Sequence, residues 1–220
     1  MYALVLILEV GIWAYRNSTN KDEEANVIPR KISDKLGKLW DIAHQGMREN
    51  RFLRAEKALL TILKIDERNA AAYNRLGILY AKQKEYKDAI DCFEIASSIE
   101  ATAPSLHNLG LIYYETENYN KAAIAFEQAL KLEDGLAARH IAYAKVQEKL
   151  GNIKLMIQEL ETSARLEPNQ ETFSLLLKAY ESHDMIAAAD AIRHKLRRTT
   201  TSQTAAARPK RVLRPRRVVI

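Results

Sequence analysis

The segment NRLGILYAKQKEYKDAIDCF at residues 74–93 returns 33 residues later as HNLGLIYYETENYNKAAIAF at residues 107–126. The two segments share their apolar and small residues and differ at most polar ones. Leu76, Gly77, Tyr80, Tyr86, Ala89, Phe93 and Ala96 correspond to Leu109, Gly110, Tyr113, Tyr119, Ala122, Phe126 and Ala129. A period of this length predicts stacked supersecondary units, none of which can bury its apolar face alone.

The spacing inside one unit predicts a pair of helices. Leu76, Gly77 and Tyr80 share one helical face, and the missing side chain of Gly77 allows a neighbouring helix to approach closely. Ala89, Phe93 and Ala96 follow at i, i+4 and i+7, so that small residues flank one aromatic ring. The polar stretches 82–88 and 115–121 suit short turns, so each unit is expected to be a helix-turn-helix hairpin.

These residues resemble the tetratricopeptide repeat, a helix-turn-helix family of 34-residue units. Gly46 departs from the pattern, because an aromatic residue is usual there. The resemblance implies an all-α fold, an α-solenoid of stacked repeats over residues 36–198. The expected repeats are 36–69, 70–102, 103–136 and 137–170, with a degenerate C-terminal helical pair at 171–198.

Composition agrees with a helical chain and limits its chemistry. Among 220 residues there are only 7 glycines and 5 prolines, which favours uninterrupted helices. The single cysteine, Cys92, excludes an internal disulfide and a cysteine-based zinc cluster. The net charge of +6 conceals an asymmetry, because ten Lys and Arg and no acid follow residue 192. Residues 1–192 therefore carry a net charge of −4 and the C-terminus is strongly basic.

The resemblance also implies an interaction surface, because the first helices of tetratricopeptide repeats line a concave groove that receives a partner peptide or helix. The expected groove residues are Trp40, His44, Met47, Asn74, Ile78, Lys82, His107, Leu111, Tyr114, Ile141 and Lys145. This mixture suits an amphipathic partner segment. The family's clamp for a C-terminal carboxylate is not reproduced. A register shifted by one residue would instead place these side chains in the core.

Catalytic and metal-binding motifs are absent from the sequence. The five histidines are scattered, and no HExxH, paired cysteines, phosphate-binding glycine loop or nucleophile elbow occurs. We expect no enzymatic activity, no cofactor and no metal site.

Residues 1–16 are apolar apart from Glu9 and Arg16, and residues 17–35 form a polar linker. As a helix, residues 1–15 would span roughly 22 Å, short of a bilayer core of roughly 30 Å. Trp13 and Tyr15 nevertheless stand where an interfacial belt belongs, so we expect a membrane-anchor helix. The cations after it predict a single-pass protein with its repeats in the cytoplasm. The alternative is a soluble cytoplasmic protein in which this segment caps the array.

Residues 199–220 are predicted to be a disordered basic tail. Its expected contacts with an anionic partner are Arg208, Lys210, Arg211, Arg214, Arg216 and Arg217. Anionic lipid and nucleic acid both fit such a strip, and a merely solvated tail is the third possibility.

The sequence thus predicts a membrane-tethered, cytoplasm-facing scaffold that binds a partner peptide or helix in its groove. The alternative is a soluble nucleic-acid- or ribosome-associated adaptor that uses the basic tail.

Overall fold

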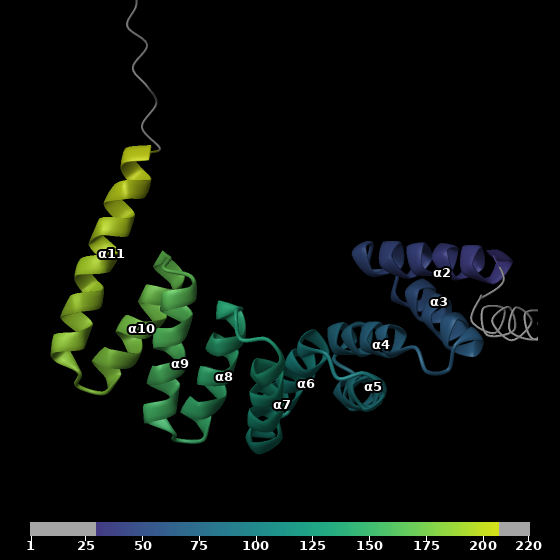
Figure 1. The fold of residues 1–220 in the computed structure, drawn as a ribbon, viewed down its shortest axis with the longest axis horizontal. Helices are drawn as coiled ribbons and strands as arrows, with labels where there is room; N and C mark the ends of the chain where they lie inside the picture. The colour runs from purple at the N-terminus through teal and green to yellow at the C-terminus, as the bar shows by residue number, and fades with distance from the viewer. Residues whose placement is uncertain (1–29, 207–220) are drawn as a thin grey trace, which may run out of the picture. The chain divides into compact units, whose positions relative to one another are not determined.

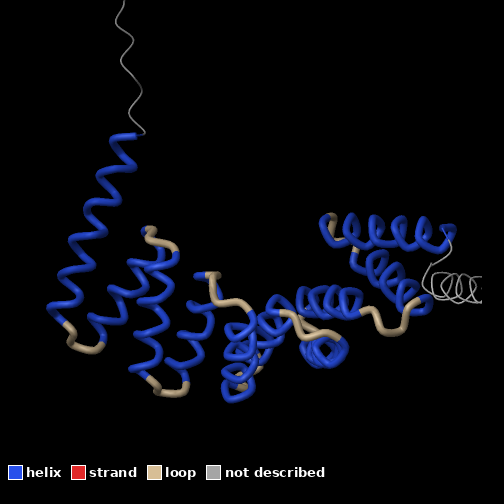
Figure 2. Tube along the Cα trace, in the orientation of Figure 1, coloured by secondary structure: helices blue, strands red, loops and turns tan. Residues whose placement is uncertain are grey.

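The structure is a computed structural model and describes residues 30–206, which form helices joined by short turns (Figures 1 and 2). The helices are α2 (Arg30–Arg48), α3 (Phe52–Ile65), α4 (Ala70–Gln83), α5 (Tyr86–Ile99), α6 (Ala103–Glu115), α7 (Tyr119–Leu132), α8 (Ala137–Lys149), α9 (Ile153–Leu166), α10 (Gln170–Ser182) and α11 (Ile186–Ala206). Residues 30–206 contain no strand. The predicted all-α chain of helical repeats is therefore confirmed within this range.

The chain divides into two compact units, residues 1–79 and residues 80–220, with the boundary inside α4. In unit 1, α2 packs on α3 as a hairpin around a core that includes Ala43, Leu59 and Ile62. A Cβ atom added to Gly46 would lie 3.0 Å from the backbone nitrogen of Ala55. The two helices thus touch at Gly46, which explains why an aromatic residue is not found there.

In unit 2, each helix packs against its neighbours along the chain. The hairpins α6–α7, α8–α9 and α10–α11 alternate with contacts between α5 and α6, α7 and α8, and α9 and α10. Phe93 and Phe126 are fully buried, and a further apolar cluster joins α8, α9, α10 and α11. This succession of local contacts is the packing of a solenoid, in which every helix pair is covered by the next.

Five turns of one geometry connect the helix pairs. Each contains one residue with positive φ: Asn50, Lys84, Glu117, Gly151 and Asp184. The residue that follows donates its backbone N–H to a carbonyl five positions earlier, as in Asn118 N–H to the oxygen of Tyr113 at 2.8 Å. This is the Schellman arrangement, which ends a helix and reverses the chain. The turns recur every 33 or 34 residues, so the hairpin is repeated from α2 to α11.

Two helices extend past the predicted bounds of the repeat array. The helix α2 covers Arg30–Arg48, so its first residues lie inside the predicted polar linker. The helix α11 continues to Ala206, beyond the predicted end of the array at residue 198, because no proline interrupts the chain before Pro209. The expected anchor at residues 1–16 and the six tail cations from Arg208 to Arg217 lie outside the described residues. Within residues 30–206, no helix is long and apolar enough to cross a membrane.

Candidate functional site

Two adjoining hollows on unit 2 form the candidate site, which we call the unit 2 groove. The first has a volume of about 300 Å³ and lies among α6, α7, α8 and α10, and the second has a volume of about 170 Å³ and lies among α8, α9 and α10. Both include Ile141 and Lys145 of α8. The groove is lined by residues that include His107, Leu111, Tyr114, Phe126, Ile141, Lys145, Glu148, Met156, Leu160, Glu171, Leu175, Lys178, Ser182 and His183.

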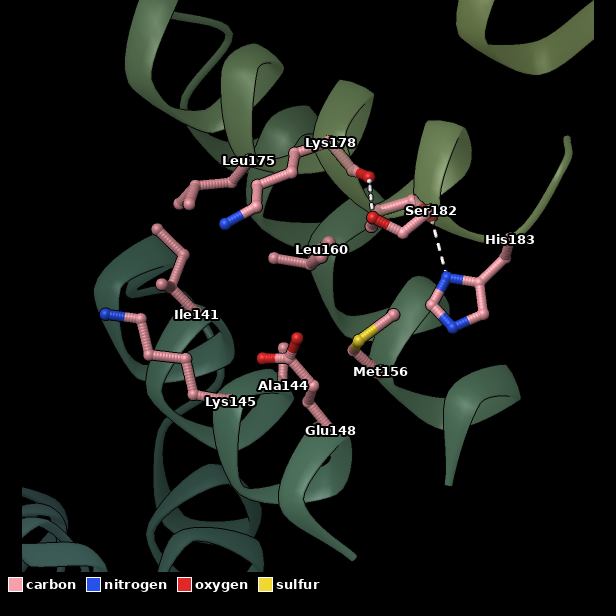
Figure 3. Close-up of a pocket in the computed structure, with 11 residues that line it drawn as sticks. Ile141, Ala144, Lys145, Glu148, Met156, Leu160, Leu175, Lys178, Ser182 and His183 are labelled. Atoms are coloured by element: carbon pink, nitrogen blue, oxygen red, sulfur yellow. Dashed lines mark hydrogen bonds between the residues drawn. The ribbon is translucent and has the colours of Figure 1, made fainter. Parts of the chain in front are cut away.

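The second hollow has an apolar base and a polar edge. Met156 and Leu160 of α9 are buried. Figure 3 shows Ile141 and Leu175 to the left of this base, on the same side as the ammonium groups of Lys145 and Lys178. If an apolar side chain of a partner entered this hollow, it would be removed from water, and the partner's backbone would stay near the ammonium groups of Lys145 and Lys178.

Some polar groups at this edge are already satisfied and others are free to meet a ligand. Ser182 donates its hydroxyl to the carbonyl of Lys178 at 2.8 Å, and Nδ1 of His183 lies 2.8 Å from the carbonyl of Ala179 (Figure 3). Lys145, Lys178 and Glu148 are exposed, and none has an ion-pair partner within 4.0 Å among residues 32–197. These three charges are the groups that a partner can address.

His107 forms part of the apolar wall of the first hollow. Its ring meets the ring of Phe126 edge-on, with the ring centroids 5.4 Å apart. Burial lowers the pKa of His107, and the nearby Arg139 cation lowers it further. Its Nδ1 is buried and makes no hydrogen bond in the described part of the chain. The imidazole is therefore neutral at neutral pH and presents little charge to a ligand.

The position of α8, which carries Ile141 and Lys145, depends on two buried polar residues. The residue before α8, Leu136, has no side-chain acceptor to cap the helix. Arg139, in the first turn of α8, donates to the carbonyl of Glu133 and, at 3.1 Å, to the carboxylate of Glu133. His140 places Nε2 at 2.7 Å from the carbonyl of Asp134 and Nδ1 at 2.6 Å from a carboxylate oxygen of Glu159. The bonds to Glu133 and Asp134 hold the loop before α8 against its first turn, and the contact with Glu159 joins α8 to α9.

Two tyrosine–glutamate hydrogen bonds join successive repeats beside the groove. Tyr113 of α6 donates its hydroxyl to Glu94 of α5, and Tyr180 of α10 donates to Glu161 of α9 at 2.5 Å. Burial raises the pKa of both tyrosines, and the bonded carboxylates raise it further. The two pairs occupy equivalent positions two repeats apart, so both fix a groove helix on the helix before it.

The structure brings together the five residues predicted from the third and fourth repeats. His107, Leu111, Tyr114, Ile141 and Lys145 all line the unit 2 groove. The exposed Lys82 lies near the end of α4 and does not line either hollow.

The residues predicted on unit 1 differ in exposure. The rings of Trp40 and His44 are tilted by 35° with centroids 5.7 Å apart; Trp40 is half-buried and His44 is exposed. Asn74 and Ile78 are half-buried on α4. Met47 was expected in the groove, but it is only 8% exposed and belongs to the core of unit 1. It follows Gly46, where α2 and α3 touch, so its side chain is enclosed there.

The sequence prediction missed the contribution of α10 and the base of the groove. Lys178 stands 33 residues after Lys145, so extending the repeat register into the degenerate fifth unit would have found it. Phe126, Met156 and Leu160 lie in second helices, which the pattern assigned to the core. These three side chains reach the groove because of how the helices pack, and no pattern in the sequence predicts it.

The described residues give no support for a reactive thiol or a metal site. Burial, together with Asp88 and Asp91, raises the pKa of the Cys92 thiol to about 11, so it stays protonated at neutral pH. No group of His, Cys, Asp and Glu side chains in the described ranges could hold a metal ion.

The chain is similar in sequence to one protein family and in fold to several solved structures. A family model described as "Tetratricopeptide repeat" matches residues 68–133. A crystal structure of MamA is 19% identical and matches with a TM-score of 0.68, covering 74% of this chain and 97% of that one. YrrB, described as a TPR protein with an unusual peptide-binding site, is 17% identical with a TM-score of 0.63, covering 86% and 94%. PilF of Pseudomonas aeruginosa is 16% identical with a TM-score of 0.67, covering 76% and 77%. No curated protein sequence matches the chain. At these identities the likeness establishes the fold.

Proposed function

We propose that this tetratricopeptide repeat protein is a non-enzymatic scaffold that binds a partner polypeptide in the unit 2 groove. Proteins built from such repeats generally mediate protein–protein interactions. The observation that carries the proposal is the combination, in one groove, of an apolar base with Lys145, Lys178 and Glu148, which lack ion-pair partners within residues 32–197. Such a surface gains free energy by covering its apolar part and by pairing its charges.

The dimensions of the groove favour one large apolar side chain as the anchor of the partner. The second hollow, about 170 Å³, is similar to engineered apolar cavities of about 150 Å³ that accept a benzene ring. A Leu, Met or Phe side chain therefore fits it. The first hollow, next to Leu111 and Tyr114, accepts a second apolar group of the same segment. The peptide-binding site that is described for YrrB supports a peptide-binding role for this fold.

A selection of random peptides on the purified full chain tests the proposal. Peptides selected on the wild type are expected to bind the double variant Leu111→Ala and Ile141→Ala at least tenfold more weakly, because both apolar contacts are reduced. The matched control is Ile124→Ala, which removes an aliphatic side chain that is 57% exposed on α7 and lines neither hollow. Equal binding to all three proteins would show that the groove is the wrong surface.

The proposal includes a membrane tether formed by residues 1–16, with the repeats on the cytoplasmic side. The apolar run, the interfacial pair Trp13 and Tyr15, and the cations that follow support this part. A tether would raise the local concentration of the partner at the membrane. Flotation of the full chain with vesicles of uncharged (zwitterionic) lipid, to which the basic tail has no electrostatic attraction, compared with a chain that lacks residues 1–16, tests it. Flotation of both, or of neither, would contradict the tether.

The basic tail supports a second, electrostatic contact. The six cations between Arg208 and Arg217 attract anionic lipid headgroups or nucleic acid. Adhesion to vesicles with anionic lipid, or a gel shift of RNA, should weaken steeply with salt and disappear when residues 207–220 are removed. A salt-sensitive RNA shift without vesicle binding would favour the alternative, a soluble nucleic-acid-associated adaptor.

A further inference from the structure

The outer side of the first hairpin is an uncovered apolar surface, which we call the end face of unit 1. It consists of Leu39 and Ile42 of α2 and Leu53, Arg54, Lys57, Ala58 and Thr61 of α3, around a hollow of about 490 Å³. Leu53 is 64% exposed, and Leu39 and Ile42 are half-buried.

The two positions that α2 contributes to this face are covered in the hairpins α6–α7, α8–α9 and α10–α11 of unit 2. The positions of Leu39 and Ile42 correspond to Leu106 and Leu109, to His140 and Tyr143, and to Phe173 and Leu176. All six are between 2% and 8% exposed.

In unit 2 the cover is the second helix of the preceding repeat. Phe173 and Leu176 of α10 belong to one buried cluster with Met156, Leu160 and Ala164 of α9, and α5 and α7 pack in the same way on α6 and α8. The helix α2 has no such predecessor within the described residues. Its outer side is therefore built to receive one more helix.

We infer that residues 1–16 of this chain dock on the end face of unit 1, as the missing preceding helix, whenever no bilayer holds them. The segment is apolar, and in a helix Leu4, Leu8 and Ile12 would share one side with the i, i+4, i+8 spacing of Met156, Leu160 and Ala164. The linker of residues 17–29 reaches up to about 45 Å, and α2 is about 28 Å long. The segment can therefore fold back along α2.

Charge complementarity points to the same occupant. Glu9 is the sole acid in residues 1–16, and it is costly in a bilayer. The end face offers Arg54 and Lys57, neither of which forms an ion pair within residues 32–197. Docking would pair Glu9 with one of these cations at the edge of the apolar contact.

This inference does not depend on the proposed groove function, and it competes with the proposed tether for the same segment. When residues 1–16 lie in a bilayer, the end face of unit 1 would be uncovered. In water, residues 1–16 would cover the end face. The two proposals can fail separately, because flotation tests the tether and a lipid-free measurement tests the docking.

Disulfide formation in the lipid-free full chain provides the test. The native Cys92 is first replaced by alanine, the residue found at the equivalent position Ala125. Leu8→Cys is then combined with Leu39→Cys on the end face or, as the matched control, with Asp41→Cys, an exposed position about 200° around α2 from Leu39. Under mild oxidation at low protein concentration, we expect an intramolecular disulfide at least tenfold faster with Leu39→Cys.

The charge pair gives a second criterion. Glu9→Lys should slow the Leu8–Leu39 disulfide several-fold, and Lys57→Glu added to it should restore the rate. Hydrogen exchange supplies a measurement without cysteines: removing residues 2–16 should speed exchange in α2 by at least tenfold and leave α8 unchanged.

Three results would overturn the inference. They are equal disulfide rates at Leu39 and Asp41, a disulfide that forms only between two molecules, and a full chain that stays in solution only with lipid. The second result would mean that another copy covers the end face.

Discussion

Gly110 of α6 lies against the ring of Phe126 in α7, so closely that a Cβ atom added to Gly110 would come within 2.9 Å of the ring atoms Cε2 and Cζ. Phe126 is fully buried, and His107 meets its ring edge-on. The missing side chain of Gly110 thus allows the α6–α7 contact and places the aromatic wall of the unit 2 groove.

Gly110→Ala should destabilise the protein by about 1–3 kcal/mol, because a methyl group there forces the buried Phe126 ring out of its position. Urea unfolding of the full chain, followed by circular dichroism, measures the change. The matched control is Gly37→Ala in α2, where an added Cβ meets nothing within 4 Å. That change should stabilise α2 by about 0.5–1 kcal/mol, since alanine is the better helix former. Two changes of the same sign would contradict this account.

The close approach at Gly110 could be predicted from the sequence, because the repeat places a glycine beside Leu109 and three positions before Tyr113. The side of each first helix that faces the groove was predictable for the same reason, because the repeat register places His107, Leu111 and Ile141 on that side. The repeat register does not predict where one residue departs from the regular packing. Met47 is enclosed because α2 and α3 touch at Gly46, a departure whose effect depends on three-dimensional packing.

The supports of α8 also escaped prediction. Arg139 and His140 are polar residues at the start of a helix, which by pattern belong on the surface. They are buried because the preceding loop offers them the carbonyl groups of Glu133 and Asp134. Bonds of this kind depend on the path of the preceding loop, and no spacing in the sequence encodes that path.

The turn residues yield a second prediction. Glu117 and Gly151 occupy equivalent turns with φ of 59° and 75°. A residue with a side chain is strained in this region, so Gly151→Ala should destabilise by about 1 kcal/mol although nothing lies within 4 Å of the new Cβ. Glu117→Gly should stabilise by about 0.5 kcal/mol, because the relief of strain exceeds the added entropy of the unfolded chain. Thermal unfolding of both variants checks the opposite signs. A stabilising Gly151→Ala would refute the argument.

His107 yields a prediction about acid stability. Its pKa is lower in the folded chain than the value of about 6.5 in an unfolded chain, chiefly because of burial and also because of Arg139. The folded state therefore binds fewer protons, and the contribution of His107 to stability is complete above about pH 6.5 and is lost as the pH falls below it. His107→Gln should reduce the loss of stability between pH 6.5 and pH 5, measured by urea unfolding at each pH. An unchanged slope would show that His107 does not contribute to it.

The tyrosine–glutamate bonds between repeats yield a prediction about alkaline stability. Tyr113→Phe and Tyr180→Phe each remove a hydroxyl that donates to a glutamate of the preceding helix, so each should cost about 1 kcal/mol at neutral pH. Burial and the carboxylates raise the pKa of both tyrosines above the unfolded value of about 10. Their contribution is therefore present below pH 10 and lost as the pH rises through the folded pKa, so the double variant should lose less stability on alkaline titration than the wild type.

Tyr114→Phe is the matched control, because its hydroxyl makes no hydrogen bond within the described part of the chain. If Tyr114→Phe lowered the free energy of unfolding as much as Tyr113→Phe, the bond to Glu94 would not be what joins α6 to α5.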